Sequence, residues 1–143
     1  MKKIAFIPIR SGSKGIKDKN IKDFNGKPLC YWTISSSSES KSIDEIYVST
    51  DSKKIIDIVE SFQLPKVKTF LRSKKTSLDT SSTESAMLEF IEKMNFDEES
   101  IFILIQATSP FTKAEDIDGA IKKISTGSSV LSVCNFNRFV WDK

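Results

Sequence analysis

A cluster of cations and small residues follows the first apolar run of the chain. The stretch IPIRSGSKGIKDKN holds Arg10, Ser11, Gly12, Ser13, Lys14, Gly15, Lys17 and Lys19. Glycine lets the backbone approach an oxyanion closely, and successive N–H groups can form an anion-binding nest. An arginine fork and a lysine ammonium both suit phosphate. The loop therefore predicts a phosphate site, with a solvated charged loop as the alternative. It matches neither the dinucleotide fingerprint GxGxxG nor the P-loop pattern GxxxxGK[ST].

Polar residues that could take part in binding or catalysis occur at three further places. Asp51 ends the stretch STD, Arg72 lies in FLRSKKTSLD, and Gln106 opens QATSPF. Each has a plain alternative. Asp51 could be the N-cap of the helix that follows it, and Arg72 could belong to a surface charge cluster. Gln106 must find a polar partner, which is either a ligand or neighbouring backbone. Thr108, Ser109 and Pro110 are first of all turn residues.

The loops that carry these residues lie between predicted strands and helices, which alternate along the chain. Short apolar runs predict strands at residues 3–9, 45–50, 66–71, 100–106 and 129–135. Helical periodicity predicts helices at residues 28–40, 52–62, 82–94 and 113–124. This alternation indicates βαβ units, a mainly parallel sheet and an α/β fold with helices on both faces. Pro8 suits the first strand only if it lies at the strand's end. The serine-rich residues 35–42 are interpreted as a helix end and a turn.

The unusual residues all follow predicted strands. Arg10 follows the first strand, Asp51 the second, Arg72 the third and Gln106 the fourth. In an open α/β sheet, ligands bind beyond the carboxyl ends of the strands. The four loops are therefore expected to open on one edge of the sheet and to form one site there.

Composition narrows the class of function. With 143 residues the chain is interpreted as one domain, residues 1–143, and its net charge of +3 does not indicate nucleic-acid binding. It has no histidine, which excludes Ser-His-Asp hydrolysis and histidine-ligated zinc. Cys30 and Cys134 are interpreted as buried thiols in a reducing compartment. The apolar start is interrupted at Arg10, and no run is long enough to span a bilayer, so we expect a cytoplasmic protein without membrane association.

Four motifs, taken in order, resemble one family. IPIRSGSKGIKDKNIKDFNGKPL, VSTD, LRSKKTSLDTSST and LIQATSPF are similar to acylneuraminate cytidylyltransferases, from Ile4 to about Val133. The resemblance implies a Rossmann-like nucleotidyltransferase fold of the nucleotide-diphospho-sugar transferase type. It also implies transfer of CMP from CTP to a nonulosonic acid of sialic or legionaminic type, with release of pyrophosphate and with Mg²⁺ as cofactor.

The resemblance also implies roles for individual residues. Arg10 and Lys19 would be the catalytic cations on the triphosphate, with Ser13 beside them. The other nucleotide-binding residues would be Ser11 and Gly12 in the same loop, and Asn20, Arg72 and Ser82 around the ribose or cytosine. Gln106 and Thr108 would contact the sugar acid. No residue is assigned as a metal ligand.

Two departures from the family pattern matter. Relatives that use 3-deoxy-manno-octulosonate carry an acidic residue where this chain has Ala107, Thr108 and Ser109, which argues against that substrate. Family members also run beyond this length, with an acidic metal-binding motif and a dimerisation segment downstream, and the full-length form is expected to be a homodimer. We therefore expect a fragment or a truncated protein. The alternatives are a CTP-binding module without turnover and a nucleotidyltransferase for a different sugar.

Overall fold

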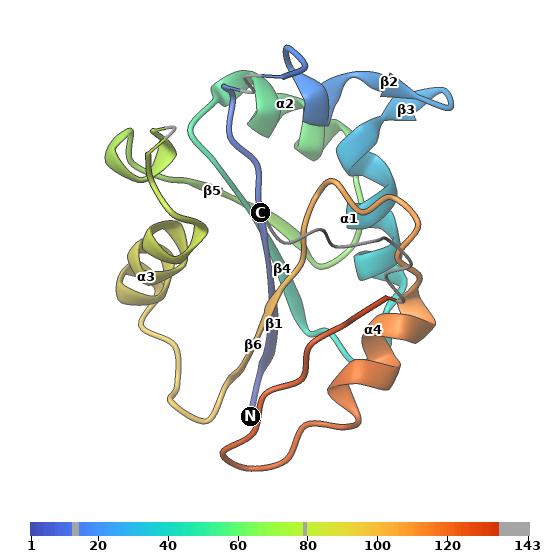
Figure 1. The fold of residues 1–143 in the computed structure, drawn as a ribbon, viewed down its shortest axis with the longest axis vertical. Coiled ribbons are helices and arrows are strands. Elements are labelled where there is room, and N and C mark those ends of the chain that lie inside the picture. Colours follow the sequence, from blue (N-terminus) through green and yellow to red (C-terminus); the bar gives the residue numbers. More distant parts are fainter. Residues whose placement is uncertain (13–14, 79, 135–143) are drawn as a thin grey trace, which may run out of the picture.

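A parallel sheet runs through the middle of the molecule (Figure 1). The computed structural model describes residues 1–12, 15–78 and 80–134. Within them the main sheet has four strands in the order β5-β4-β1-β6. Their bounds are Lys3–Pro8 for β1, Glu45–Thr50 for β4, Val67–Leu71 for β5 and Ile101–Leu104 for β6. Each neighbouring pair is parallel, which confirms the predicted α/β class.

Helices cover both faces of this sheet. They are α1 at Leu29–Glu39, α2 at Lys53–Ser61, α3 at Thr83–Met94 and α4 at Ala114–Ile121. In Figure 1, α3 lies alone on one side of the strands, and α1 and α4 lie on the other. Residues 40–44 connect α1 to β4 as a short turn, so the serine-rich stretch is a helix end and a turn, as predicted.

Side chains of β1 alternate between two cores because successive residues of a strand point to opposite faces. Ala5, Ile7 and Ile9 pack with α1, α2 and α4 in the larger cluster. Ile4 and Phe6 pack in the smaller cluster with Tyr47 and with Ala86 and Phe90 of α3. This double burial explains the nearly continuous apolar run at the start of the chain.

Pro8 lies at the last position of β1, where the sequence required it to be. The chain stays attached to β4 one residue later, because the Ile9 amide donates to the Ser49 carbonyl at 2.8 Å. The missing N–H of Pro8 therefore does not disturb the central strand.

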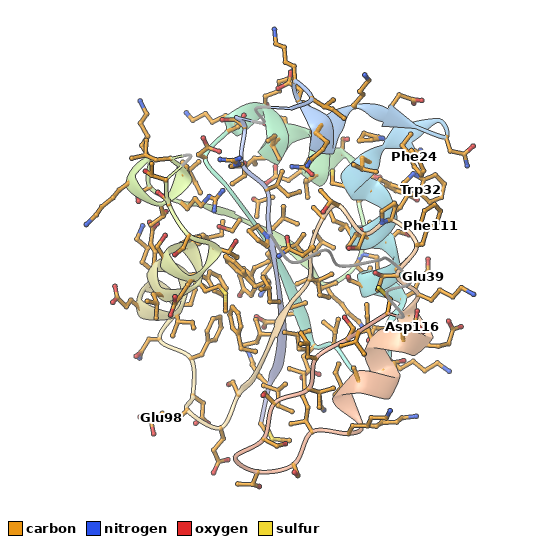
Figure 2. All side chains as sticks on the ribbon, in the orientation of Figure 1. Phe24, Trp32, Glu39, Glu98, Phe111 and Asp116 are labelled. Atoms are coloured by element: carbon orange, nitrogen blue, oxygen red, sulfur yellow. The ribbon has the colours of Figure 1, made fainter. Side chains whose placement is uncertain are left out.

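A hairpin that sequence reasoning missed leads into α1. Its strands are β2 at Asp23–Phe24 and β3 at Lys27–Pro28, and the two turn residues Asn25 and Gly26 have φ of 55° and 81°. Asn-Gly is the strongest short-range signal for such a hairpin. The indole N–H of Trp32 donates to the Phe24 carbonyl at 2.9 Å and fastens the hairpin to α1. Figure 2 shows Phe24, Trp32 and Phe111 along the same side of the molecule.

The end of the described chain differs from two predictions. Residues 129–134 form no strand, so the strand predicted at 129–135 is wrong within the part that is described. Leu131 and Val133 are 82% and 86% exposed. Cys134 is exposed rather than buried, whereas Cys30 is buried as expected. A strand needs a hydrogen-bonded neighbour, and an apolar pattern alone does not supply one.

The last strand of the sheet is also shorter and less buried than predicted. It covers Ile101–Leu104, and Leu104 is 40% exposed because β6 lies at the edge of the described sheet with β1 as its neighbour. No helix among the described residues is long and apolar enough to cross a membrane.

Candidate functional site

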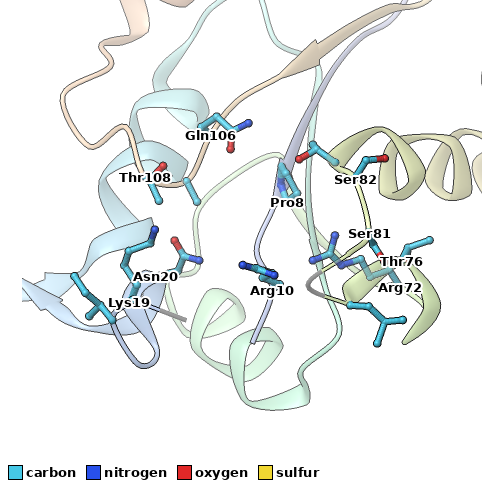
Figure 3. Close-up of a pocket in the computed structure, with 15 residues that line it drawn as sticks. Pro8, Arg10, Lys19, Asn20, Arg72, Thr76, Ser81, Ser82, Gln106 and Thr108 are labelled. Atoms are coloured by element: carbon cyan, nitrogen blue, oxygen red, sulfur yellow. The ribbon is translucent and has the colours of Figure 1, made fainter. Parts of the chain in front are cut away.

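A pocket of about 650 Å³ opens at the carboxyl ends of the strands (Figure 3). Three of the four predicted loops line it, represented by Arg10, Lys19 and Asn20, by Arg72, and by Gln106 and Thr108. Its volume lies within the range of small-molecule sites, about 300–1,000 Å³. The expectation that four loops form one site at this edge of the sheet is therefore confirmed for three of them, whereas Asp51 is not among the lining residues.

Arg72 is a buried cation at this pocket. It is only 7% exposed, so it does not belong to a surface charge cluster. Burial lowers its pKa, the carboxylates of Asp51 and Glu89 raise it, and Arg10 lowers it again. Figure 3 shows the side chains of Arg10 and Arg72 on neighbouring parts of the pocket wall. Two guanidinium groups at one pocket create a positive potential that favours an anion.

Two buried polar atoms of the pocket residues have no hydrogen-bond partner among the described residues. They are Oδ1 of Asn20 and Nε of Arg72. Buried polar atoms are nearly always satisfied, and an unsatisfied one requires an explanation. Because both residues line the pocket, a ligand or a water molecule bound there can satisfy both atoms.

Lys19 and Asn20 are presented by a short 3-10 turn, η1 at Lys19–Ile21. The turn is preceded by Asp18 in the left-handed region, with φ of 52°, and the Ile21 amide donates to the Asp18 carbonyl at 3.0 Å. Figure 3 shows Lys19 and Asn20 side by side on the wall opposite Arg72. The turn thus places an ammonium and an amide across the pocket from a guanidinium.

The small residues of the first loop lie differently. Ser11 and Gly12 are exposed and are not among the pocket-lining residues, and Ser13 lies outside the described residues. The Ser11 amide donates to Oδ1 of Asp51 at 2.9 Å, and the Ser11 hydroxyl donates to Oδ2 at 2.7 Å. The N-cap of α2 is Ser52, so the interpretation of Asp51 as that cap is wrong.

Gln106 and Thr108 are exposed residues of the loop that follows β6. The Ser109 amide donates to the Gln106 carbonyl at 3.1 Å, which confirms the predicted turn. The hydroxyl of Thr33, on α1, reaches the carbonyls of Ala107 and Ser109 at 3.4 and 3.1 Å. Helix α1 therefore holds this loop at the mouth of the pocket.

The loop between β5 and α3, which carries Arg72, also supplies two lining residues to which sequence reasoning gave no role, Thr76 and Ser81. Ser82 lines the pocket and is also the N-cap of α3, where its Oγ accepts from the Ser85 amide at 3.1 Å. A serine hydroxyl has a second lone pair and a proton, so capping leaves it able to contact a ligand.

Glu89 of α3 fixes the loop that carries Arg72 and Thr76. Its carboxylate accepts from the Ser73 amide at 2.9 Å, from the Ser73 and Thr76 hydroxyls, and from Lys93 at 2.6 Å. Burial favours the neutral acid, but these donors outweigh it and lower the pKa of Glu89 to about 2. No motif pointed to this residue, since its partners come from another segment of the chain.

The described residues do not fit a metal site. None of the pocket-lining residues is a carboxylate, and no group of three or more His, Cys, Asp or Glu side chains in the described part of the chain is arranged to hold a metal ion. Mg²⁺ prefers carboxylate and phosphate oxygens. We therefore assign it no protein ligand here.

Comparisons with known proteins agree with this geometry. The sequence family described as Cytidylyltransferase matches residues 4–137. A CMP-N,N'-diacetyllegionaminic acid synthase of Legionella pneumophila is 39% identical, over 93% of this chain and 58% of that protein. An N-acylneuraminate cytidylyltransferase of Streptococcus agalactiae is 34% identical, over 88% of this chain and 30% of that protein. The chain thus spans less than two thirds of the length of either relative.

Solved structures show the same fold. A CMP-2-keto-3-deoxy-manno-octonic acid synthetase, solved in complex with CTP, superposes with a TM-score of 0.70 at 23% identity, over 85% of this chain and 46% of that one. A Mycobacterium tuberculosis protein solved in complex with manganese has a TM-score of 0.59 at 8% identity, over 85% and 59%. Among fold neighbours a divalent metal therefore occurs, and the likeness to these structures concerns the fold alone.

Proposed function

The chain belongs to the cytidylyltransferase family, and from that premise we propose that its pocket binds CTP for transfer of CMP to a nonulosonic acid, with release of pyrophosphate. The observation that supports the proposal most directly is the set of residues that line the pocket. Arg10, Lys19 and Arg72 surround a pocket in which Asn20 and Arg72 each have a buried polar atom without a partner among the described residues. A nucleoside triphosphate supplies both the anion and the polar groups that such a pocket lacks.

Arg10 and Lys19 are the residues that we propose to act on the triphosphate. In the reaction, the anomeric hydroxyl oxygen of the sugar acid bonds to the α-phosphorus, and the bond from that phosphorus to the β-phosphate oxygen breaks. Negative charge moves onto the leaving pyrophosphate, and the hydroxyl proton passes to solvent. Cations fixed beside the phosphates stabilise this charge without reorganising. Ser11, Gly12 and Ser13 of the same loop are proposed to contribute to nucleotide binding.

The remaining residues divide between the two ends of the substrate. Asn20, Arg72 and Ser82 are proposed to contact the ribose or the cytosine, because their polar atoms come from two facing walls. Gln106 and Thr108 are proposed to contact the sugar acid, because they stand exposed at the mouth of the pocket.

Further properties of the proposal come from the family resemblance. We propose Mg²⁺ as the metal that accompanies CTP, a single cytidylyltransferase-like unit over residues 1–143, a cytoplasmic location and a homodimeric full-length form. The described pocket residues include no carboxylate to hold Mg²⁺, so the role proposed for these residues is to bind and orient the nucleotide. We accordingly expect the 143-residue chain to bind CTP but to turn over slowly or not at all.

A nucleotide panel tests this proposal against its alternatives. Thermal unfolding is measured with CTP, UTP, ATP and GTP at equal concentration, and CTP is expected to raise the Tm most, since a ligand stabilises the state that binds it. Equal stabilisation by ATP or GTP would contradict the cytidylyl assignment. Pyrophosphate release from CTP with N-acetylneuraminic or N,N'-diacetyllegionaminic acid then separates a CTP-binding module from an enzyme.

A further inference from the structure

A carboxylate outside the pocket wall connects two of its cationic elements. We propose that Asp51 is a positioning residue, which holds the loop of Arg10 in place through Ser11 for the incoming triphosphate. This inference rests on the proposed function, because it concerns how the same pocket receives its nucleotide.

The first connection is a two-point contact. Both oxygens of Asp51 accept from Ser11, one from the backbone amide at 2.9 Å and one from the hydroxyl at 2.7 Å. Ser11 directly follows Arg10 in the chain. A residue held at both its amide and its side chain has little rotational freedom, so the backbone that carries Arg10 leaves the sheet in a fixed direction.

The second connection runs to Arg72. The Asp51 carboxylate favours the charged guanidinium, and the Arg72 amide donates to the carbonyl of Thr50, the residue before Asp51, at 2.9 Å. Ser11, Asp51 and Arg72 follow β1, β4 and β5, which are neighbours in the sheet. The adjacency of these strands therefore brings the three residues together although the sequence separates them widely.

The charge balance indicates why a carboxylate belongs there. The charge of Arg10 repels that of Arg72 and contributes to lowering the pKa of Arg72. Burial opposes ionisation of Asp51, but the two bonds from Ser11, together with Arg72, lower its pKa below the usual value. Asp51 is thus anionic, and it is not among the pocket-lining residues, so it offsets the repulsion without facing the phosphates. A group that acts on a ligand through other residues in this way is a positioning group.

The test compares two variants that remove the same charge. Asp51→Asn is expected to lower the CTP affinity measured by titration calorimetry on the order of tenfold, a typical loss for a hydrogen bond to a charged group. Asp57→Asn, at an exposed position of α2, is the matched control and should leave the affinity unchanged. Ser11→Ala keeps the amide bond and loses the hydroxyl bond, so it should have a smaller effect and provides a second test if Asp51→Asn does not fold.

Hydrogen exchange of the Ser11 amide in the free protein gives a readout that needs no nucleotide. Asp51→Asn should speed this exchange, and Asp57→Asn should not. If the wild type binds CTP and Asp51→Asn binds it equally well, the inference is overturned and the proposed function stands. Unchanged exchange at Ser11 would overturn the positioning route. A wild type that fails to bind CTP would overturn the proposed function and this inference together.

Discussion

Arg72 shows how one residue reveals the character of the site. An arginine residue that is only 7% exposed has lost most of its hydration, which is costly unless other groups replace the water. Asp51 and Glu89 compensate its charge in part, yet its Nε has no partner within the described residues. A ligand at the pocket would complete the environment of this group, which is why we propose Arg72 as a residue that recognises the nucleotide.

Replacement of Arg72 should therefore change selectivity. Arg72→Ala is expected to weaken CTP binding by about 1.5–3 kcal/mol, the range for hydrogen bonds to charged groups, and to reduce the preference for CTP over UTP. The measurement is the ratio of the two dissociation constants. Lys74→Ala, at an exposed position two residues away, serves as the control. An unchanged CTP/UTP ratio in Arg72→Ala would mean that Arg72 does not recognise the base.

Single residues were only partly predictable from the sequence. The charges of Arg10 and Lys19 and their position after a buried strand indicated an anion site. The burial of Arg72 and the contact of Asp51 with Ser11 could not be predicted, because both depend on the adjacency of β1, β4 and β5. Asp51 and Ser52 are equally good N-cap residue types, so composition could not decide which of them caps α2.

At the scale of elements, helix α3 is coupled to the pocket through Glu89. Donors from Ser73, Thr76 and Lys93 converge on its carboxylate and fix the loop beside Arg72. These contacts connect α3 to the wall of the pocket. Because they are made to an ionised carboxylate, their strength depends on pH.

Glu89→Gln should lower the free energy of unfolding by about 1–2 kcal/mol at neutral pH, since a partly exposed charged acceptor contributes less than a buried one. The folded-state pKa is about 2, below the ordinary value of 4.5, so the contribution is present above pH 4.5 and is lost as pH falls toward 2. The Tm difference between wild type and variant should shrink over that range. A difference that is constant with pH would contradict this account of Glu89.

Two glycines, one in the hairpin before α1 and one in α4, are expected to change stability in opposite directions when replaced by alanine. Gly26 has φ of 81°, and Gly26→Ala should destabilise the protein by about 1 kcal/mol because a Cβ disfavours that conformation. Gly119 lies within α4 with open space around a Cβ, so Gly119→Ala should stabilise it by about 0.5–1 kcal/mol. Chemical denaturation measures both changes. Equal signs would show that the backbone conformation at Gly26 does not govern the effect.

The order of strands and helices was largely predictable, and the exceptions have physical reasons. The strand at 45–50 and the helices near 53–61 and 83–94 match their apolar periodicity. The helix at 29–39 forms as predicted, although its buried face includes the polar residues Thr33, Ser37 and Ser38. The short hairpin was missed because two-residue strands carry no periodic signal, although Asn25 and Gly26 were present as a turn signal. The strand predicted at 129–135 was wrong within its described part because its residues pair with no neighbour there.

At the scale of the whole molecule, two cores hold the sheet between its helices. The larger joins α1, α2 and α4 to one face, and the smaller joins α3 to the other. Phe90 is the centre of the smaller core, with ring centroids 5.0 Å from Phe6, 4.9 Å from Tyr47 and 5.1 Å from Phe70. Because α3 also carries Ser82 and Glu89, this core positions one wall of the pocket.

Phe90→Ala should therefore cost about 3–5 kcal/mol of stability, the usual range for removing a buried aromatic side chain. Leu88→Ala, on the same helix at a position that is 54% exposed, should change stability by less than about 0.5 kcal/mol. Denaturant titrations of both variants give the comparison. Similar losses in the two would mean that α3 does not pack through Phe90.

The central claim is that this pocket binds the triphosphate of CTP through Arg10 and Lys19, and titration calorimetry tests it most directly. CTP is titrated into the wild type, Arg10→Ala, Lys19→Ala and the exposed control Lys123→Ala. We expect the first two variants to lose about 1.5–3 kcal/mol of binding free energy each, with the control unchanged. Equal CTP affinity in all four proteins would contradict the claim and would show that the loop after β1 is a solvated turn.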